Sequence, residues 1–229
     1  MLDSNTIVIV PTLTANAYSD NGFYDFYKGE CNEECLTVPI KETPDLKYSS
    51  SHTAVNVFKT LGYPLLTDLA LHQNPSLLKD YKKVILLHSE YVTQQVFDAI
   101  QSHDNVVYLY PNALYAKVEI IENCKNDICS PDGPQYFMRL IRGHNYSDNL
   151  YPTPVANGFD WYYDNSRPYE YNKTCKDWLF NKIDNGYQLN CYPENIIVKN
   201  KDLLREIKQV TTRPMDCFMG ETVYYPEHC

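Results

Sequence analysis

The sequence predicts an α/β protein with a doubly wound, mainly parallel β-sheet. Up to about Glu122, short β-branched and aliphatic runs alternate with segments whose apolar residues recur at helical spacing. Such alternation is typical of parallel strands joined by right-handed crossover helices that cover both faces of the sheet. The chain has 229 residues, 44% of them hydrophobic and 21% charged, which fits one large domain with a packed core.

The first strand and helix are predicted from two contrasting patterns. The run Thr6–Val10 is continuously β-branched and ends at Pro11, as expected for a strand buried on both faces. A polar, aromatic loop follows it. Between Ser51 and Gly62 the apolar residues have helical spacing, at Ala54, Val55, Phe58 and Leu61. We therefore expect this segment to be the first crossover helix.

The next segments continue the alternation. A short strand is expected at Pro64–Leu69, and a short helix at Pro75–Tyr81 has proline in its first turn. The apolar run Lys83–His88 predicts the next buried strand. A helix over Thr93–Ser102 and a strand over Asn105–Tyr110 complete this part of the chain.

After about Glu122 turn residues, cysteines and aromatic residues dominate. The short apolar run within Gly133–Arg142 fits either a strand or a helical turn. Near the end the alternation resumes, with a strand predicted at Asn195–Val198 and a helix beginning at its Asp202 cap. We expect a single domain over 1–229, divided into a core at about 6–122 and 195–210, a cysteine- and aromatic-rich insertion at about 123–194 and a C-terminal tail at 211–229.

The cysteines predict disulfides rather than a metal site. They are even in number and lie in polar, turn-rich stretches, and no Cys-x-x-Cys pair occurs. Their close spacing suggests that Cys31 pairs with Cys35, Cys124 with Cys129 and Cys175 with Cys191, although other connectivities are open. The eight positions are Cys31, Cys35, Cys124, Cys129, Cys175, Cys191, Cys217 and Cys229.

Disulfides indicate an oxidising compartment, so we expect a secreted or cell-surface protein. Asn145 and Asn172 begin triplets that match the glycan acceptor pattern, although a chain rich in Asn would carry one or two by chance. The start at Met1 has no basic segment or apolar stretch, which suggests that a signal peptide or anchor has been removed. No apolar run approaches the roughly 18 residues that cross a bilayer, so no membrane span is expected.

Charge and motifs exclude several kinds of partner. The formal charge of -9 opposes nucleic-acid binding, which needs clustered lysine and arginine. Neither glycine-rich phosphate signature occurs, so no nucleotide cofactor is expected. The six histidines lack metal-ligand spacing. An acidic stretch lacks the calcium-loop pattern and fits a solvated surface better, at Asp20, Asp25, Glu30, Glu33 and Glu34.

The order of elements between Thr6 and Glu119 resembles class I glutamine amidotransferase-like domains, particularly their ThuA-like and dimethylformamidase-like branches. The matching features are the strand Tyr81-Lys-Lys-Val-Ile-Leu-Leu-His88 and the turn Tyr110-Pro-Asn-Ala-Leu114 that follows the next strand. The resemblance implies a flavodoxin-like or amidotransferase-like scaffold. Active members carry a cysteine nucleophile in this turn, whereas this chain has Asn112 there and lacks a downstream His-x-Glu pair. The resemblance therefore implies the fold without amidotransferase activity.

Candidate site residues follow from the rule that ligands bind beyond the carboxyl ends of strands in an open α/β sheet. His88 and Glu90 are the acid/base-capable pair, and residues two apart in a strand face the same side. A plainer interpretation is that His88 satisfies a backbone group and Glu90 caps the helix at Thr93. The remaining candidates at these strand ends or in nearby loops are Thr12, Thr14, Asn16, Tyr18, Ser89, Asn112, Tyr115 and His144.

The 21 tyrosines are the most unusual feature of the composition. They cluster at Phe23–Tyr27 and Phe159–Asp164, where Trp161 could centre a recognition patch for a protein or sugar. Alternatively, these rings pack an irregular insertion. We expect an extracytoplasmic binding or interaction domain whose partner is a surface protein, a glycan or a small ligand. One alternative is a hydrolase of an amide or glycosidic bond that uses His88, Glu90 and Asn112. A third is a structural subunit or surface-layer component, in which a partner would cover the aromatic patch.

Overall fold

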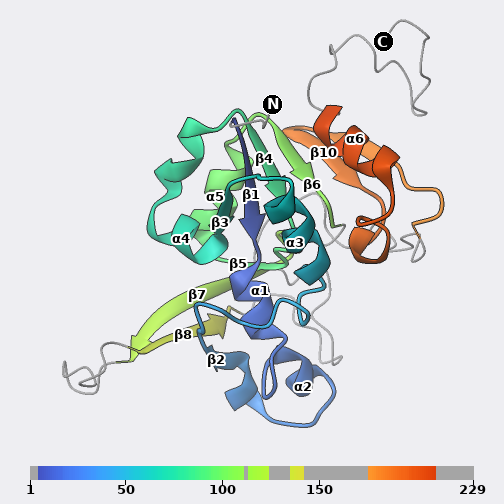
Figure 1. Cartoon of the computed structure of the whole chain (residues 1–229). Helices are drawn as coiled ribbons and strands as arrows, with labels where there is room; N and C mark the ends of the chain where they lie inside the picture. The colour runs from blue at the N-terminus through green and yellow to red at the C-terminus, as the bar shows by residue number, and fades with distance from the viewer. Residues whose placement is uncertain (1–4, 111–112, 124–134, 142–174, 210–229) are drawn as a thin grey trace, which may run out of the picture.

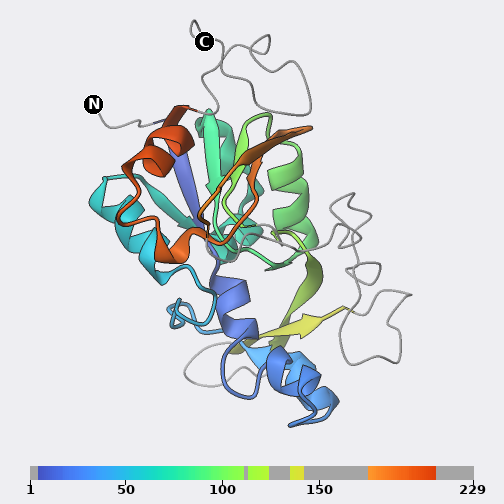
Figure 2. The ribbon, with the colours of Figure 1, turned by 90° about the vertical axis from the view of Figure 1, so that its right-hand side faces the viewer.

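The computed structural model describes residues 5–110, 113–123, 135–141 and 175–209, and it has two β-sheets (Figure 1). The main sheet has six strands in the order β3-β1-β4-β6-β10-β9, and the smaller sheet has four in the order β2-β8-β7-β5. Figures 1 and 2 both place the smaller sheet, with α1 and α2, at one end of the main sheet. The chain is therefore an α/β structure, as predicted.

The main sheet is parallel except at one edge. β1 pairs with β3 on one side and β4 on the other, β4 pairs with β6, and β6 pairs with β10, all in parallel. β9 runs antiparallel to β10 at the edge. The strands are β1 (Thr6–Val10), β3 (Leu65–Thr67), β4 (Lys83–Leu86), β6 (Val106–Tyr108), β9 (Phe180–Ile183) and β10 (Gly186–Leu189).

Helices cover both faces of the main sheet because its strands are apolar on both sides. In β1, Val8 and Val10 pack toward α3 (His52–Thr60) and α6 (Lys201–Gln209). Ile7 and Ile9 pack on the opposite face, which is covered by α4 (Asp68–Gln73), the 3-10 helix η2 (Pro75–Asp80) and α5 (Gln94–Gln101). This alternation is the period-2 pattern of a strand with two buried faces.

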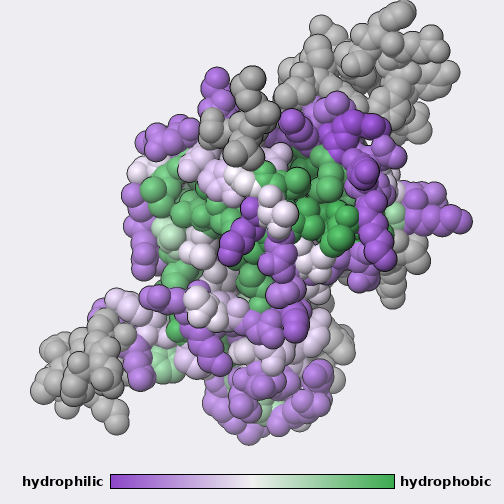
Figure 3. Space-filling view, in the orientation of Figure 1, coloured by the Kyte–Doolittle hydropathy of each residue, from purple (hydrophilic) through white to green (hydrophobic). Residues whose placement is uncertain are grey.

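The smaller sheet and its helices form a third apolar cluster. Leu13 of α1 (Thr12–Ala17) and Phe23 of α2 (Phe23–Tyr27) pack with Val118 and Met138 there. The 3-10 helix η1 (Glu33–Leu36) precedes β2. The strands are β2 (Thr37–Pro39), β5 (Tyr91–Val92), β7 (Ala116–Asn123) and β8 (Gln135–Leu140). Figure 3 shows mostly hydrophilic residues over α2 and β2, whereas apolar residues appear over the main sheet.

Three expectations about the end of the chain are wrong. Asp202 is not the cap of α6, because Asn200 accepts from the N–H of Leu203 at 2.9 Å. The stretch predicted as a strand at Asn195–Val198 holds turns and the short 3-10 helix η4 (Pro193–Asn195), and its apolar character comes from Ile197, which is buried against the helices. The last parallel strand is instead β10, which lies within the stretch assigned to the irregular insertion. Gly186 permits this pairing, because a Cβ there would lie 1.8 Å from the carbonyl oxygen of Val106.

Two of the suggested disulfides are confirmed. Cys31 is bonded to Cys35 ahead of β2, and Cys175 is bonded to Cys191 across the β9–β10 hairpin. The second bridge is buried in the core beside α3 and α6. The other predicted cysteines lie outside the described residues, at Cys124, Cys129, Cys217 and Cys229.

Candidate functional site

The topology of the main sheet selects one place for a site, at the carboxyl ends of β1 and β4. From β1 the chain winds to β3 on one side, and it then crosses back to β4 on the other side of β1. Ligands of open α/β sheets bind at such a reversal of strand order. The segments that leave these two ends are α1, followed by Tyr18, and the turn from Leu87 to Glu90.

Three side chains meet there, and we call them the His88–Glu90–Tyr18 cluster. His88 Nε2 lies 3.4 Å from Glu90 Oε2, so the two side chains do meet, although in the turn that follows β4 and not within the strand, where alternation was expected to place them. The hydroxyl of Tyr18 donates a hydrogen bond to the same carboxylate oxygen. His88 is 5% exposed and Glu90 is 7% exposed, whereas Tyr18 is half-buried. An acidic group and a basic group thus share a nearly dry position.

The protonation of His88 follows from its second ring nitrogen. Nδ1 lies 2.7 Å from the carbonyl oxygen of Ser49, which can only accept, so Nδ1 carries a proton. Nε2 is buried and has no hydrogen-bond partner among the described residues, although it faces Glu90. A neutral imidazole and a carboxylate would place two lone pairs against each other at this contact. A hydrogen-bond donor at this contact would satisfy both acceptors.

Tyr18 remains a hydrogen-bond donor over the neutral range. Burial raises the pKa of its hydroxyl well above the ordinary value of 10.0, and the nearby charge of Glu90 raises it further. The protonated phenol can therefore stabilise the Glu90 carboxylate by a charge-assisted hydrogen bond.

Aromatic rings surround the cluster. The ring of Tyr110 stacks on His88 with centroids 5.1 Å apart, and Tyr192 meets His88 edge-on at 5.4 Å. Tyr24 packs on Tyr18 with centroids 4.5 Å apart, and it is 43% exposed. Tyr192 is half-buried, whereas Tyr110 is fully buried, so Tyr18, Tyr24 and Tyr192 form the accessible border of the buried polar pair.

Glu194 holds the Tyr110 and Tyr192 side of this border in place. Its carboxylate accepts from the backbone N–H groups of Thr53 and Ala54 at 2.5 and 3.2 Å, at the start of α3. The Tyr110 hydroxyl donates to the same carboxylate at 3.3 Å and to a backbone carbonyl at 2.8 Å. Burial, followed by the charge of Glu194, raises the pKa of Tyr110 well above its ordinary value. The first turn of α3 has no acidic residue of its own, so Glu194 supplies the negative charge at this helix start.

Sequence reasoning assigned other residues to this edge, and the structure gives several of them structural contacts. Thr14 is buried and its hydroxyl accepts from the N–H of Tyr91 at 3.1 Å. Tyr115 is 8% exposed and packs in the core of the smaller sheet, and Thr12 is buried in α1. Asn16 bonds the backbone of Lys41. The candidates outside the described residues are Asn112, His144, Asn145, Trp161 and Asn172.

The plainer interpretation, in which His88 satisfies a backbone group and Glu90 caps the helix at Thr93, is correct for His88 and wrong for Glu90. His88 does bond a backbone carbonyl, as above. Glu90 is not the cap of α5, because the hydroxyl of Thr93 accepts from the N–H of Val96 at 3.4 Å. Sequence reasoning missed Ser49, Tyr110, Tyr192 and Glu194 as neighbours of the cluster.

Metal ligation finds no support in the part of the chain that the structure describes, where no three His, Cys, Asp or Glu residues gather at one point. Across those same residues, none of the helices combines the length and apolar character needed to cross a membrane. The chain matches no protein-family model, and it has no significant match among curated proteins or solved structures. The likeness to amidotransferase-like domains therefore remains a prediction from the order of elements.

Proposed function

We propose that this chain is an extracytoplasmic binding domain on a flavodoxin-like, amidotransferase-like scaffold without amidotransferase activity. Its ligand is an uncharged, hydroxyl-bearing group such as a sugar residue of a glycan, held at the His88–Glu90–Tyr18 cluster. The observation that carries this proposal is the buried Nε2 of His88, which faces Glu90 and has no hydrogen-bond partner among the described residues, beside the accessible ring of Tyr24 and the half-buried ring of Tyr18.

The strand order supports the scaffold. Numbered along the chain, the five parallel strands β1, β3, β4, β6 and β10 take the order 2-1-3-4-5 across the sheet. That order is the flavodoxin-like variant of the doubly wound fold, in which the ligand lies at the switch between strands 1 and 3. Those strands are β1 and β4 here, and they carry the cluster.

The chemistry of the border supports a sugar. Tyrosine rings offer flat apolar faces with polar edges, which suit the alternating C–H and O–H groups of a sugar. A carboxylate and an imidazole nitrogen accept hydrogen bonds from hydroxyl groups, which supply the donors that Nε2 lacks. The formal charge of -9 disfavours anionic ligands at this edge.

The disulfides support the location. Two bridges are formed, and such bridges persist in oxidising compartments. We infer a secreted or cell-surface protein, on which Asn145 and Asn172 are candidate glycan acceptors.

A hydrolase acting on a glycosidic or amide bond is the second candidate, and the contact between His88 and Glu90 favours it. In an enzyme, a proton bound between His88 Nε2 and Glu90 Oε2, which lie 3.4 Å apart, could be delivered to a leaving group. Against it, the Ser89 hydroxyl has no hydrogen-bond partner among the described residues, so no base is in place there to activate it as a nucleophile. Binding is therefore the stronger proposal.

Saturation-transfer NMR with neutral mono- and disaccharides tests the proposal. We expect saturation transfer to sugar protons that Tyr18→Phe weakens and His88→Gln abolishes, because each removes a polar partner. Tyr48→Phe is the matched control, since Tyr48 is exposed and bonds Asp20 instead. No transfer to any sugar, or equal transfer with His88→Gln, would contradict the proposal. Spectra that show cleaved sugar would favour the hydrolase.

A further inference from the structure

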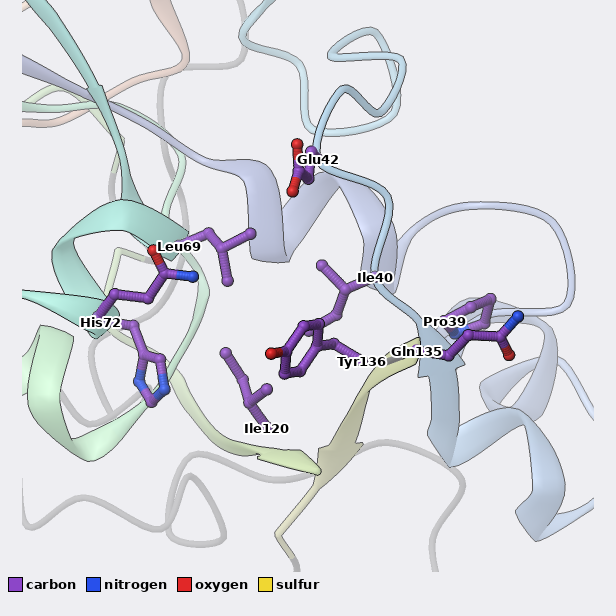
Figure 4. A pocket seen from close by; sticks show the side chains of 9 residues that line it. Pro39, Ile40, Glu42, Leu69, His72, Ile120, Gln135 and Tyr136 are labelled. Atoms are coloured by element: carbon purple, nitrogen blue, oxygen red, sulfur yellow. The ribbon is translucent and has the colours of Figure 1, made fainter. Parts of the chain in front are cut away.

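A hollow of about 500 Å³ lies between α4 and the smaller sheet, lined by residues that the His88–Glu90–Tyr18 cluster does not use (Figure 4). Small-molecule sites in proteins have volumes of roughly 300 to 1,000 Å³. Ile40, Leu69 and Ile120 contribute the aliphatic part of the lining. The hollow therefore has the size and the apolar walls of a ligand site.

The hollow exists because the β7–β8 hairpin is longer than the core beneath it. The register pairs Val118 with Leu140, Ile120 with Met138 and Glu122 with Tyr136, which places these side chains on one face of the hairpin. Val118, Met138 and Leu140 are buried, whereas Ile120 is half-buried and Tyr136 is 45% exposed. Ile120 and Tyr136 thus continue this face past the core, and among the described residues no side chain fills the space between it and α4.

The charged and polar residues that line the hollow determine whether it favours a cationic or an anionic ligand. Glu42 is the charged residue in the lining, and neither lysine nor arginine is found among the described residues that form it. Lys117, the lysine of β7, donates a hydrogen bond from its ammonium group to the side-chain oxygen of Gln94 at 2.9 Å. The lining therefore disfavours an anion and can stabilise a cation.

His72 is compatible with a cation in this hollow. Burial lowers the pKa of its ring below the ordinary value of 6.5, so the imidazole is uncharged at pH 7. Its Nδ1 lies 2.9 Å from the hydroxyl of Thr93, which fixes the ring. In Figure 4 the hydroxyl of Tyr136 points into the hollow toward the side that carries Leu69 and His72.

We propose that this hollow binds a small organic cation, an alkyl- or arylammonium compound. Its apolar body lies against Ile40, Ile120 and the ring of Tyr136, and its ammonium group faces Glu42. Burial of the apolar body supplies most of the affinity, and the carboxylate selects the charge. The site is independent of the function proposed for the His88–Glu90–Tyr18 cluster.

NMR titration with three compounds of similar shape tests this proposal. The probes are 2-phenylethylammonium, 2-phenylethanol and 3-phenylpropionate. We expect the ammonium compound to bind about threefold to fivefold more tightly than the alcohol, as for a partly exposed ion pair, and the carboxylate to bind most weakly. Chemical-shift changes should map to β7, β8 and α4.

Variants assign the effect to named residues. Glu42→Gln should remove the preference for the ammonium compound over the alcohol, and Tyr136→Ala should weaken both by about fivefold or more because it removes apolar contact. Glu34→Gln, which changes an exposed carboxylate outside the hollow, should leave the preference intact. His88→Gln should also leave it intact. Equal binding of all three probes, tighter binding of the carboxylate, no binding at millimolar concentration, or a preference that survives Glu42→Gln would overturn the proposal.

Discussion

Asp68 should make the free energy of unfolding fall as pH rises through the neutral range. Its side chain is fully buried at the carboxyl end of β3, and it accepts from the N–H of Leu13 at 3.1 and 3.3 Å. Burial raises the pKa of this carboxyl from 3.8 to about 8, although hydrogen bonds from backbone N–H groups act in the opposite direction. The folded protein therefore holds a proton on Asp68 that the unfolded chain has already released.

The sign and size of the effect follow from this difference in bound protons. Between about pH 4 and pH 8 the folded state binds one proton more than the unfolded state at Asp68. The stability from this group is fully present below the unfolded pKa and is lost as pH rises toward the folded pKa. The slope is about 1.4 kcal/mol per pH unit, so raising the pH from about 5 to 7 should lower the free energy of unfolding by about 2 to 3 kcal/mol.

Urea unfolding from about pH 5 to 9, with the disulfides intact, measures this slope. Asp68→Asn cannot exchange the proton, so its stability should vary with pH by about 1.4 kcal/mol less per unit than that of the parent chain. Asp104→Asn, at an exposed carboxylate, is the matched control and should keep the slope of the parent. The reasoning is refuted if Asp68→Asn and the parent have the same slope, or if the parent alone gains stability as pH rises.

Three further predictions concern contacts between distant parts of the chain. Glu194→Gln weakens the cap of α3 and should lower the free energy of unfolding by about 1 kcal/mol in urea titrations; no change would exclude the cap. Replacing both Cys175 and Cys191 with serine opens a loop with a sequence separation of 16 and should cost about 3 kcal/mol, measured by thermal unfolding against the parent. Lys83→Met leaves the carbonyl groups at the end of α6 without a buried donor, so hydrogen exchange in the last turn of α6 should accelerate; unchanged exchange there would contradict this role.

The strands of the main sheet could be predicted where they are buried on both faces. Thr6–Val10 and Lys83–His88 are continuous apolar runs, and the structure places β1 and β4 within them. The run at Asn195–Val198 has the same appearance, but Ile197 alone is fully buried while Val198 is 59% exposed. A short apolar run therefore does not separate a strand from a turn that inserts one anchor into the core.

Helix α1 shows why local sequence was insufficient beside the site. Threonine and asparagine are weak helix formers, and the sequence around Thr12 and Asn16 reads as a loop. The helix begins at this point because Asp68, 55 residues further along the chain from Leu13, accepts from the N–H of Leu13. A cap supplied by a distant element, here the first residue of α4, leaves no signal within the helix itself.

The residues of the candidate site also differ in how far their contacts could be predicted from the sequence. The contact between His88 and Glu90 agrees with the prediction but has another cause, because β4 ends at Leu86 and the turn after it, not strand alternation, brings the two side chains together. Other contacts join residues that are far apart in the sequence. Ser49 and His88 are separated by 39 residues, and Tyr110 and Glu194 by 84. These contacts depend on how whole helices and strands pack together, so they cannot be predicted from the spacing of residues in the sequence.

The β9–β10 hairpin has a consequence for the site. Cys191 is joined to Cys175 across this hairpin, and the next residue, Tyr192, packs its ring against His88. Two residues later, Glu194 fixes the start of α3 and the hydroxyl of Tyr110, whose ring stacks on the other part of His88. Cys191, Tyr192 and Glu194 therefore link the disulfide, one ring of the border and the helix cap within one short segment. Because that segment contacts His88 through Tyr192 and holds Tyr110 through Glu194, the environment of the imidazole depends on the oxidised hairpin as well as on the turn that carries it.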